Sequence, residues 1–371
     1  MKFLDEYRDA EFANDLIKQI CATTTQRWVL MDVCGGQTHN LVRSGIETAL
    51  QDALEIIHGP GCPVCVTPSQ VIDFAIALSH RPNTILTSFG DMLRVPGSHE
   101  SMLTARSAGG DIRAVYSPID ALKMAIEHPS KEIVFLGVGF ETTAPATALA
   151  LLQAERGGIQ NFSIIPAHVR VQPAMEAIVQ SPDNRVQAFL AAGHVCTITG
   201  YQSLESFSQT SRTPIVVTGF EPIDLLDGIL HSVRLLEANE VRVVNRYARN
   251  VQRDGNVSAL QTVESVYEVG DRSWRGFGNI PSGALVLRED WKHYDASEKF
   301  AAYIPTQIPD DQRCRAADVM AGRIKPMECE AFGRDCTPES PLGAPMVSSE
   351  GACAAYARFQ TTLITPLDRP E

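Results

Sequence analysis

The stretch RWVLMDVCGGQTH (27–39) decides the fold. Its short apolar run predicts a buried strand over 27–33, and the polar CGGQTH that follows predicts a loop over 34–39. Two glycines allow the backbone to turn tightly there. Cys34 therefore stands at the carboxyl end of a strand, which is the edge where ligands collect in parallel α/β sheets.

The same alternation of strand and helix continues along the chain. Strands followed by helices predict parallel sheets with right-handed crossovers, so we expect an α/β fold. The expected strands begin the stretches 54–65 and 131–145 and occupy 84–91, 113–118, 162–168, 188–195 and 214–222; the expected helices are 69–79, 119–128, 143–155 and 222–236.

The length of 371 residues allows two or three domains. We expect two consecutive parallel-sheet α/β domains, at 27–130 with the thiol motifs and at 131–236. The pattern changes after residue 236, where we expect a helix over 240–256 and a turn-rich strand connection over 274–283. A smaller third domain is expected from the C-terminal region, 237–371, together with the N-terminal helix in 1–26.

Composition excludes several classes of protein. An apolar content of 44% and a net charge of −12 describe a soluble globular chain and disfavour nucleic acid and anionic membranes as partners. No apolar run is long enough for a membrane span, and the amphipathic N-terminus lacks the apolar core of a signal peptide. We therefore expect a cytoplasmic protein, whose nine cysteines favour metal binding or redox chemistry over structural disulfides.

Four of these cysteines, Cys314, Cys329, Cys336 and Cys353, lie in a proline- and glycine-rich segment. Such a segment is mostly loop, and four thiolates on one metal centre would hold it. Tetrahedral zinc and an iron–sulfur cluster both take four cysteines, but the gaps are longer than the C-x2-4-C pairs of structural zinc sites, which favours the cluster. Four unrelated buried thiols are the alternative.

Cys62 and Cys65 form a C-x-x-C pair after the second expected strand. This spacing favours a dithiol that closes to a disulfide and reopens, with half a zinc site as the alternative. Cys34 is interpreted as a metal-binding or nucleophilic thiolate, against a buried structural cysteine. Asp32 and His39 are its expected neighbours, able to tune the thiol or to shuttle a proton.

The segment 137–142, GVGFET, lacks the third glycine of a dinucleotide fingerprint, because Thr142 stands there. We expect Glu141 and the two threonines after it to face the site between the α/β domains, with helix capping by a threonine as the alternative. His168, His194 and Cys196 are interpreted as structural. The residues expected to take part in chemistry are Cys34, Cys62, Cys65, His39, Asp91 and Glu141.

Taken together, the motifs resemble the HypD family of hydrogenase maturation proteins. The resemblance rests on MDVCGGQTH, HGPGCPVC, TSFGDMLRVPGS, VYSPIDALK, VGFETTAP, GHV, GFEPIDLL, WRGFG and EAFGRDCTPESPLGAPMVSSEGACAAY, and it runs from about residue 3 to 358. It implies a scaffold, not a metabolic enzyme, on which the iron–dicyanide–carbonyl group of nickel–iron hydrogenase is assembled.

The resemblance also implies partners and cofactors. The partners are a small HypC-type chaperone, a HypE-type cyanide donor supplied through HypF, and, indirectly, the hydrogenase large-subunit precursor. A 4Fe–4S cluster maps onto Cys314, Cys329, Cys336 and Cys353, which makes the third domain an iron–sulfur domain. Cys34 maps onto the ligand of the iron that carries cyanide and carbonyl, shared with a HypC cysteine. The Cys62/Cys65 pair would relay electrons between them.

The chain departs from the family pattern at several positions. Asp32 and Gln37 stand where the first block usually has glutamate and histidine, Cys196 ends the GHV block in place of serine, and Arg315 replaces the usual glycine. A free-standing iron–sulfur thiol oxidoreductase that uses the Cys62/Cys65 dithiol is the competing interpretation, and a structural zinc protein is a third.

Overall fold

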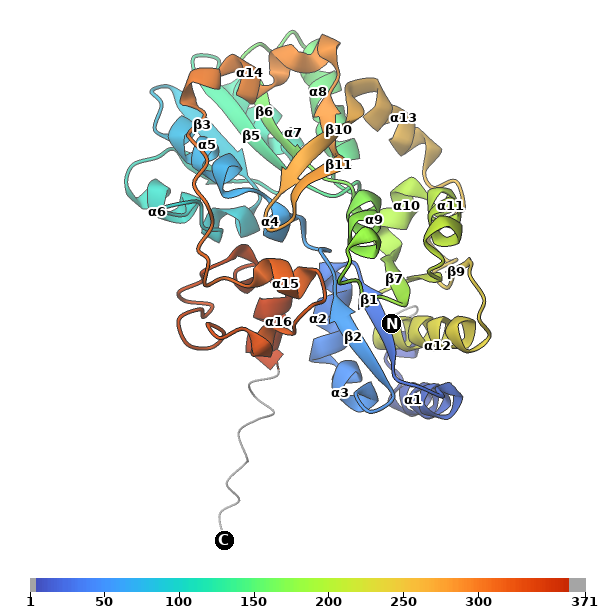
Figure 1. Cartoon of the computed structure of the whole chain (residues 1–371). Helices are drawn as coiled ribbons and strands as arrows, with labels where there is room; N and C mark the ends of the chain where they lie inside the picture. Colours follow the sequence, from blue (N-terminus) through green and yellow to red (C-terminus); the bar gives the residue numbers. More distant parts are fainter. Residues whose placement is uncertain (1–4, 360–371) are drawn as a thin grey trace. The chain divides into compact units, whose positions relative to one another are not determined.

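The computed structural model describes residues 5–359 of the chain (Figure 1). These residues divide into two compact units, each assembled from separate stretches of sequence. Unit 1 holds the stretches up to residue 62, 175–255 and from 313 onward, and unit 2 holds 63–174 and 256–312. The chain therefore passes repeatedly from one unit to the other, and each unit is described by itself.

Unit 1 is built on a five-stranded, all-parallel sheet with the order β2-β1-β7-β8-β9. Its strands are β1 (Trp28–Asp32), β2 (Leu54–His58), β7 (Ala188–Ala192), β8 (Ile215–Thr218) and β9 (Val243–Asn245). The central strands β7 and β8 are buried along their whole length, as expected where helices cover both faces of a parallel sheet.

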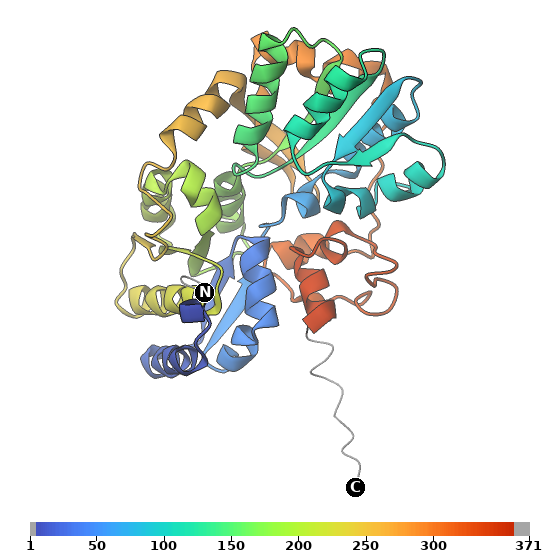
Figure 2. The same cartoon turned by 180° about the vertical axis from the view of Figure 1, so that it is seen from behind.

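One apolar core joins this sheet to several helices of unit 1, and in it Leu30, Leu190 and Val216 of the strands meet Leu226 and Ile229 of a long helix. The helices and turns are η1 (Asp5–Tyr7), α1 (Ala10–Thr23), α2 (Gly35–Arg43), α3 (Ile46–Leu50), α10 (Gly193–Thr199), α11 (Gln202–Ser211), α12 (Pro222–Glu237), α15 (Ala316–Met320), η5 (Pro326–Glu328), η6 (Ala344–Met346) and α16 (Ala352–Phe359). Helix α1 lies along α12, and α16 packs on α2 (Figures 1 and 2).

Unit 2 contains a second parallel sheet with the order β4-β3-β5-β6 and a separate antiparallel hairpin, β10-β11. The strands are β3 (Thr84–Ser88), β4 (Ile112–Ala114), β5 (Glu132–Gly139), β6 (Phe162–His168), β10 (Tyr267–Trp274) and β11 (Gly278–Leu287). The helices and turns are α4 (Pro63–Val66), α5 (Ser69–Ser79), η2 (Gly90–Arg94), α6 (Met102–Ser107), α7 (Pro118–Glu127), α8 (Ala144–Arg156), α13 (Val257–Val266), η3 (Glu289–Tyr294), α14 (Ala296–Lys299) and η4 (Ala301–Tyr303). Helix α9 (Val171–Gln180) carries the chain from unit 2 into unit 1.

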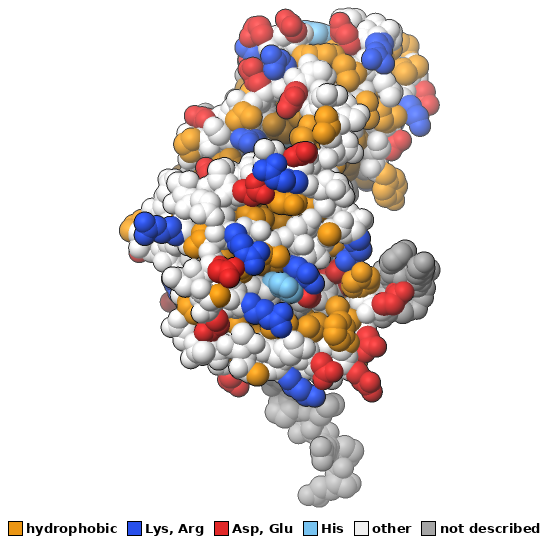
Figure 3. Space-filling view, turned by 90° about the vertical axis from the view of Figure 1, so that its right-hand side faces the viewer, with side chains coloured by type: hydrophobic (Ala, Val, Ile, Leu, Met, Phe, Trp, Pro, Cys, Tyr) orange, Lys and Arg blue, Asp and Glu red, His pale blue; other side chains and the backbone are white. Residues whose placement is uncertain are grey.

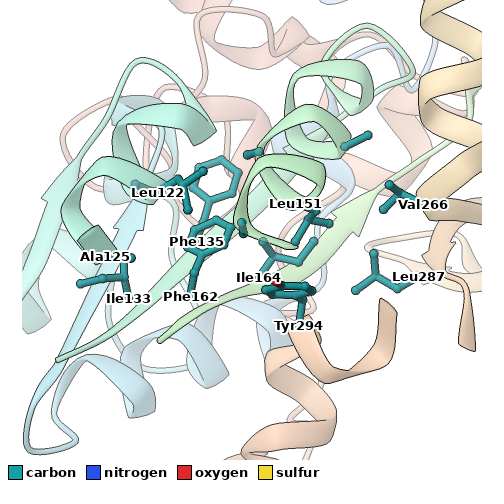
Figure 4. Close-up of a cluster of buried hydrophobic side chains, with 14 of the residues drawn as sticks. Leu122, Ala125, Ile133, Phe135, Leu151, Phe162, Ile164, Val266, Leu287 and Tyr294 are labelled. Carbon is teal, nitrogen blue, oxygen red and sulfur yellow. The ribbon is translucent and has the colours of Figure 1, made fainter. Parts of the chain in front are cut away.

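The core of unit 2 forms where helices α7 and α8 cover the sheet (Figure 4). Phe135 of β5 and Phe162 of β6 lie fully buried against Leu122 of α7 and Leu151 of α8. Complete burial of aromatic and aliphatic side chains of this size stabilises a unit by about 1.5–3 kcal/mol for each side chain.

The expected α/β class with parallel sheets is confirmed, but the structure groups the segments differently from the expected boundaries at 130 and 236. Strands from 27–130 and from 131–236 pair within both sheets, and β9 from the C-terminal region completes the first. Local hydrophobic pattern marks a strand but not its neighbour, because any parallel strand can pair with any other. The four-cysteine segment belongs to unit 1, and α1 packs on α12.

Two local expectations are wrong. Residues 35–39, expected in a loop, form the start of helix α2 directly after Cys34. Residues 240–256, expected as a helix, contain the edge strand β9 and turns. Val243 and Val244 are β-branched and complete the sheet by pairing with β8, which outweighs the charged, helix-like pattern around them.

Acidic and basic side chains lie interspersed on the surface (Figure 3). The exposed ion pairs of the described residues include Arg253 with Glu205 and Lys292 with Glu289. In the described part of the chain, no helix combines the length and the apolar character that a bilayer crossing requires.

Candidate functional site

Cys34 is placed by the junction of β1 and α2, where it is the N-cap residue of the helix. The backbone N–H groups of Gln37 and Gly36, in the first turn of this helix, favour the thiolate. Burial is the larger effect, and it raises the pKa of the Cys34 thiol far above its ordinary value. The thiol therefore keeps its proton until a metal or another electrophile displaces it.

His194 supplies the nearest ring nitrogen to this thiol. It lies in the first turn of α10, directly after β7, and its Nδ1 is 3.6 Å from the Cys34 sulfur. Burial lowers the pKa of His194 to about 4, so the ring is neutral and can accept a proton. The ring of Phe220 lies 5.3 Å away, and Tyr247 packs on Phe220. Sequence reasoning treated His194 as structural, although its position after an apolar strand was a usable signal.

The loop that leads to Cys62 contacts the turn that contains Cys34. The Gly35 N–H donates to the Gly61 carbonyl at 2.9 Å. A Cβ atom at Gly61 would stand 2.2 Å from the Cys34 nitrogen, so only glycine permits this approach. Cys62 is joined to Cys65 as a disulfide. The thiol and the disulfide are thus held on neighbouring loops by backbone contacts.

Asp32 and His39, the expected neighbours of Cys34, face other groups. Asp32 is fully buried, and its two oxygens contact Thr38 Oγ1 at 2.6 Å and His58 Nδ1 at 2.5 Å. His39 lies one turn into α2, where its Nδ1 is 3.1 Å from the Ser349 carbonyl oxygen. His39 therefore contacts the C-terminal segment that contains the four cysteines.

Glu141 and Asp91 lie in unit 2. Glu141 follows β5, and its Oε1 accepts the Val171 N–H at 3.2 Å, whereas Oε2 is buried with no hydrogen-bond partner. Burial raises the pKa of Glu141 to about 7, so this carboxyl group is poised to hold or release a proton near neutral pH. Asp91 is exposed in η2, after β3.

His168 is a second buried polar group at that edge of the sheet. It ends β6, it is fully buried, and its Nδ1 has no hydrogen-bond partner. Burial and the nearby charge of Arg272 lower the pKa of His168 to about 3, so the ring is neutral. Its Nε2 is 3.4 Å from the Thr147 hydroxyl.

The four C-terminal cysteines gather in unit 1. Burial, followed by the charges of Cys314, Cys336 and Cys329, raises the pKa of the Cys353 thiol well above its usual range, so Cys353 lies within electrostatic reach of the other three. Cys329, Cys336 and Cys353 share one small apolar cluster, and the Cys336 sulfur accepts the Leu342 N–H at 3.4 Å.

The arrangement of these four thiols can be tested against the expected metal group. Among residues 5–359, no three or more His, Cys, Asp or Glu side chains form a group that could hold a metal ion. A Cβ atom at Gly343 would stand 2.4 Å from the Cys314 sulfur, so the absence of a side chain there leaves room for this sulfur. Four cysteine thiols are a donor set that both a tetrahedral zinc ion and a 4Fe–4S cluster accept.

Comparison with known proteins identifies the family of this chain. Residues 11–360 match the family model HypD, described as "Hydrogenase formation hypA family". The hydrogenase maturation factors HypD of Rhodobacter capsulatus and of Escherichia coli K12 are each 42% identical, over 97% of this chain and 98% of their own lengths. HypD2 of Bradyrhizobium diazoefficiens is 43% identical over the same shares.

The chain belongs to the HypD family. It is a hydrogenase maturation factor by that membership, and the match covers both units and the four-cysteine segment. Within this HypD-family chain, the structure brings Cys34 together with His194 and the Cys62 loop, and it gathers the four C-terminal cysteines. It leaves Asp91 exposed and gives His39 a contact with Ser349.

Proposed function

We propose that this chain is the scaffold on which the iron–dicyanide–carbonyl group of nickel–iron hydrogenase is assembled. The observation that carries the proposal is the Cys34 thiol, held at the carboxyl edge of a parallel sheet beside a neutral histidine. The iron with its ligands is the cargo of this scaffold. A soft thiolate suits low-spin iron that carries cyanide and carbonyl.

Loading of iron on Cys34 requires removal of the thiol proton. Burial opposes a free thiolate at this position, so the charge of the arriving iron has to compensate for it. His194 Nδ1, 3.6 Å from the sulfur, is the acceptor within reach of that proton. The helix N–H groups of Gly36 and Gln37 then stabilise the negative sulfur.

Cys314, Cys329, Cys336 and Cys353 would hold a 4Fe–4S cluster in this proposal. When bound, such a cluster supplies single electrons. The Cys62–Cys65 disulfide is the redox group of the chain itself, since its opening takes up two electrons and two protons and gives two thiols. Glu141, with its pKa raised to about 7, is the proposed proton donor of unit 2.

A scaffold needs partners that bring the ligands and take the product. We propose a HypC-type chaperone that shares the iron through its own cysteine, a HypE-type donor of cyanide and, indirectly, the hydrogenase large-subunit precursor, all in the cytoplasm. The relatives are hydrogenase maturation factors, which supports partners from the same maturation machinery.

A free-standing thiol oxidoreductase is the second candidate function. The Cys62–Cys65 disulfide favours it, because a closed C-x-x-C pair is also the working part of such enzymes. The two candidates differ in cargo: a scaffold carries iron beyond the cluster and copurifies with a chaperone, whereas an oxidoreductase turns over a dithiol substrate alone.

The test is an infrared spectrum of anaerobically copurified protein and HypC-type partner, with iron and sulfide counted on the same sample. We expect cyanide and carbonyl bands and more iron than one cluster needs. Cys34→Ala should remove the bands and leave the visible absorption of the cluster, and Cys21→Ala, at an exposed cysteine of α1, should change neither. Bands that persist in Cys34→Ala would refute the assignment of Cys34. Cluster iron without bands in the unaltered protein would favour the oxidoreductase.

A further inference from the structure

A buried polar network lies near the Cys34 turn in unit 1. Its centre is Glu47 of α3, whose two carboxylate oxygens are 2.5 and 2.6 Å from the Tyr356 hydroxyl of α16. Lys325 donates from its ammonium group to the same carboxylate. His58, at the end of β2, places Nε2 3.2 Å from the Tyr356 hydroxyl and 3.5 Å from Glu47 Oε2. Its other nitrogen, Nδ1, is 2.5 Å from Asp32.

The surroundings of His58 require both of its ring nitrogens to carry protons. Nδ1 faces the Asp32 carboxylate and Nε2 faces the Glu47 carboxylate, and only the imidazolium can donate in both directions. Two carboxylates, one ammonium group and one imidazolium also make the network neutral. Neutrality matters because Asp32, His58 and Glu47 are 0%, 3% and 5% exposed, and an uncompensated charge at such depth is strongly destabilising.

The network connects parts of unit 1 that carry chemistry. Asp32 ends β1, two residues before Cys34, and His58 ends β2, four residues before Cys62. Tyr356 lies about one helical turn after Cys353 in α16, and Lys325 precedes Cys329 by four residues. The hydrogen bonds therefore run from the strand ends beside the thiol and the disulfide to both sides of the four-cysteine segment.

We propose that His58 is a positioning residue: its imidazolium, with Glu47 and Tyr356, ties the four-cysteine segment to the ends of β1 and β2. Loss of its proton loosens the tie. The role in cargo assembly rests on the proposed function, because it assumes that Cys34 and the four-cysteine segment work together. The existence of the tie does not depend on that function.

The charges around His58 set the pH at which the tie opens. Burial alone would lower the pKa of His58, but Asp32 and Glu47 outweigh it and raise this pKa to about 9. Burial would raise the pKa of Glu47, but His58 and Lys325 lower it to about 2. Tyr356, whose pKa is raised by burial and by the charge of Glu47, stays neutral. The tie is thus closed at neutral pH and opens as the pH approaches 9.

The first test is hydrogen exchange of the α16 amides in the full chain, expressed as protection against intrinsic exchange, from about pH 6 to pH 10. In the unaltered protein, protection should be constant at neutral pH and fall as the pH approaches 9. His58→Gln, which carries no titratable proton, should show protection at least about tenfold lower at neutral pH and no fall toward pH 9. His231→Gln, which alters another histidine–aspartate pair of unit 1, on α12, should match the unaltered protein.

A milder variant keeps the proposal testable if His58→Gln does not fold. Tyr356→Phe keeps the ring, which lies edge-on to His58 at 5.6 Å, and removes only the hydroxyl. We expect α16 to lose protection at least about threefold while the central strands of unit 1 keep theirs. Unchanged protection in Tyr356→Phe, or a fall toward pH 9 in His58→Gln that matches the unaltered protein, would overturn the proposal.

Infrared spectra of Tyr356→Phe separate this inference from the proposed function. If both hold, the visible absorption of the cluster remains and the cyanide and carbonyl bands weaken at least about threefold, because only the position of the segment has changed. Bands of full intensity beside a loosened α16 would remove the role of the tie in assembly. An unaltered protein without bands would refute the proposed function, whereas the exchange result would still decide the tie.

Discussion

The tripeptide Gly-Phe-Glu follows a parallel strand in each unit, and the two glutamates have opposite surroundings. Glu221, after β8, is the N-cap residue of α12 in a reciprocal capping box with Asp224, and Arg8 donates to both of its carboxylate oxygens. Glu141, after β5, has one buried oxygen with no hydrogen-bond partner. The same three letters thus give a satisfied carboxylate in unit 1 and an unsatisfied carboxyl group in unit 2.

The difference shows which of the two glutamates can be explained by its contribution to stability alone. A capping carboxylate with an arginine partner lowers the free energy of the folded state. A buried carboxyl oxygen without a partner raises it by about 1–3 kcal/mol, so its presence calls for another reason, such as proton transfer. Stability therefore explains Glu221, whereas Glu141 remains the candidate for the proposed proton transfer.

The contrast extends to the whole edge of each sheet. In unit 1, the buried carboxylates Asp32 and Glu47 are balanced by His58 and Lys325. In unit 2, His168 and Tyr267 each keep a buried polar atom without a partner, as Glu141 does. The buried charges of unit 1 are thus paired, and Gln37 is the one residue described there that keeps a buried side-chain atom without a partner, whereas unit 2 has three such residues.

The largest expected effect comes from breaking this network of paired charges. Glu47→Ala leaves His58 and Lys325 without their shared carboxylate and should destabilise unit 1 by about 3–5 kcal/mol. Chemical unfolding at neutral pH, followed by circular dichroism, measures the loss. Glu205→Ala, which removes only an exposed pair with Arg253, is the matched control and should change stability far less. Equal losses in the two variants would mean that the network is not balanced by charge.

The second prediction is a gain in the stability of the folded state. The raised pKa of Glu141 means that its contribution to stability is fully present below the unfolded value of 4.5 and is lost as the pH rises through about 7. Glu141→Gln does not ionise, so its stability relative to the unaltered protein should increase between these values, by up to about 3 kcal/mol, and then level off. Hydrogenase maturation in cells should fall nevertheless, as expected for a functional residue.

Unfolding curves of both proteins across this pH range test the sign of the change in stability. A Glu141→Gln variant that is less stable than the unaltered protein at every pH would place Glu141 with Glu221, as a structural residue. A variant with unchanged stability and unchanged maturation would remove the proposed proton donor.

The sequence predicted the class of this fold and the positions of its cysteine motifs. The apolar runs at β1 and β5 predicted parallel strands, and the cysteine motifs predicted a thiol at a strand end and a four-thiol segment. These signals are local, because a buried strand and a proline-rich loop each show their character within a few residues.

Features that depend on distant pairing could not be predicted in this way. One of the two partners of β1 is β7, more than 150 positions along the chain, so the composition of each unit and the approach of His194 to Cys34 follow from sheet order and not from local pattern. The different surroundings of Glu141 and Glu221 also depend on residues that are distant in the sequence. Arg8, in the N-terminal segment, donates to Glu221, and no local sequence pattern predicts that contact.

The smallest expected effect tests this last contact. Glu221→Gln keeps a side-chain oxygen for the helix cap but removes the charge that faces Arg8, and both side chains are partly exposed, at 25% and 55%. The loss should therefore be below about 1 kcal/mol and should shrink in high salt, because screening already weakens an exposed pair. Thermal unfolding at low and high ionic strength measures it. A larger, salt-independent loss would show that Glu221, like Glu141, has a role beyond its visible partners, and the contrast between the two turns would then fail.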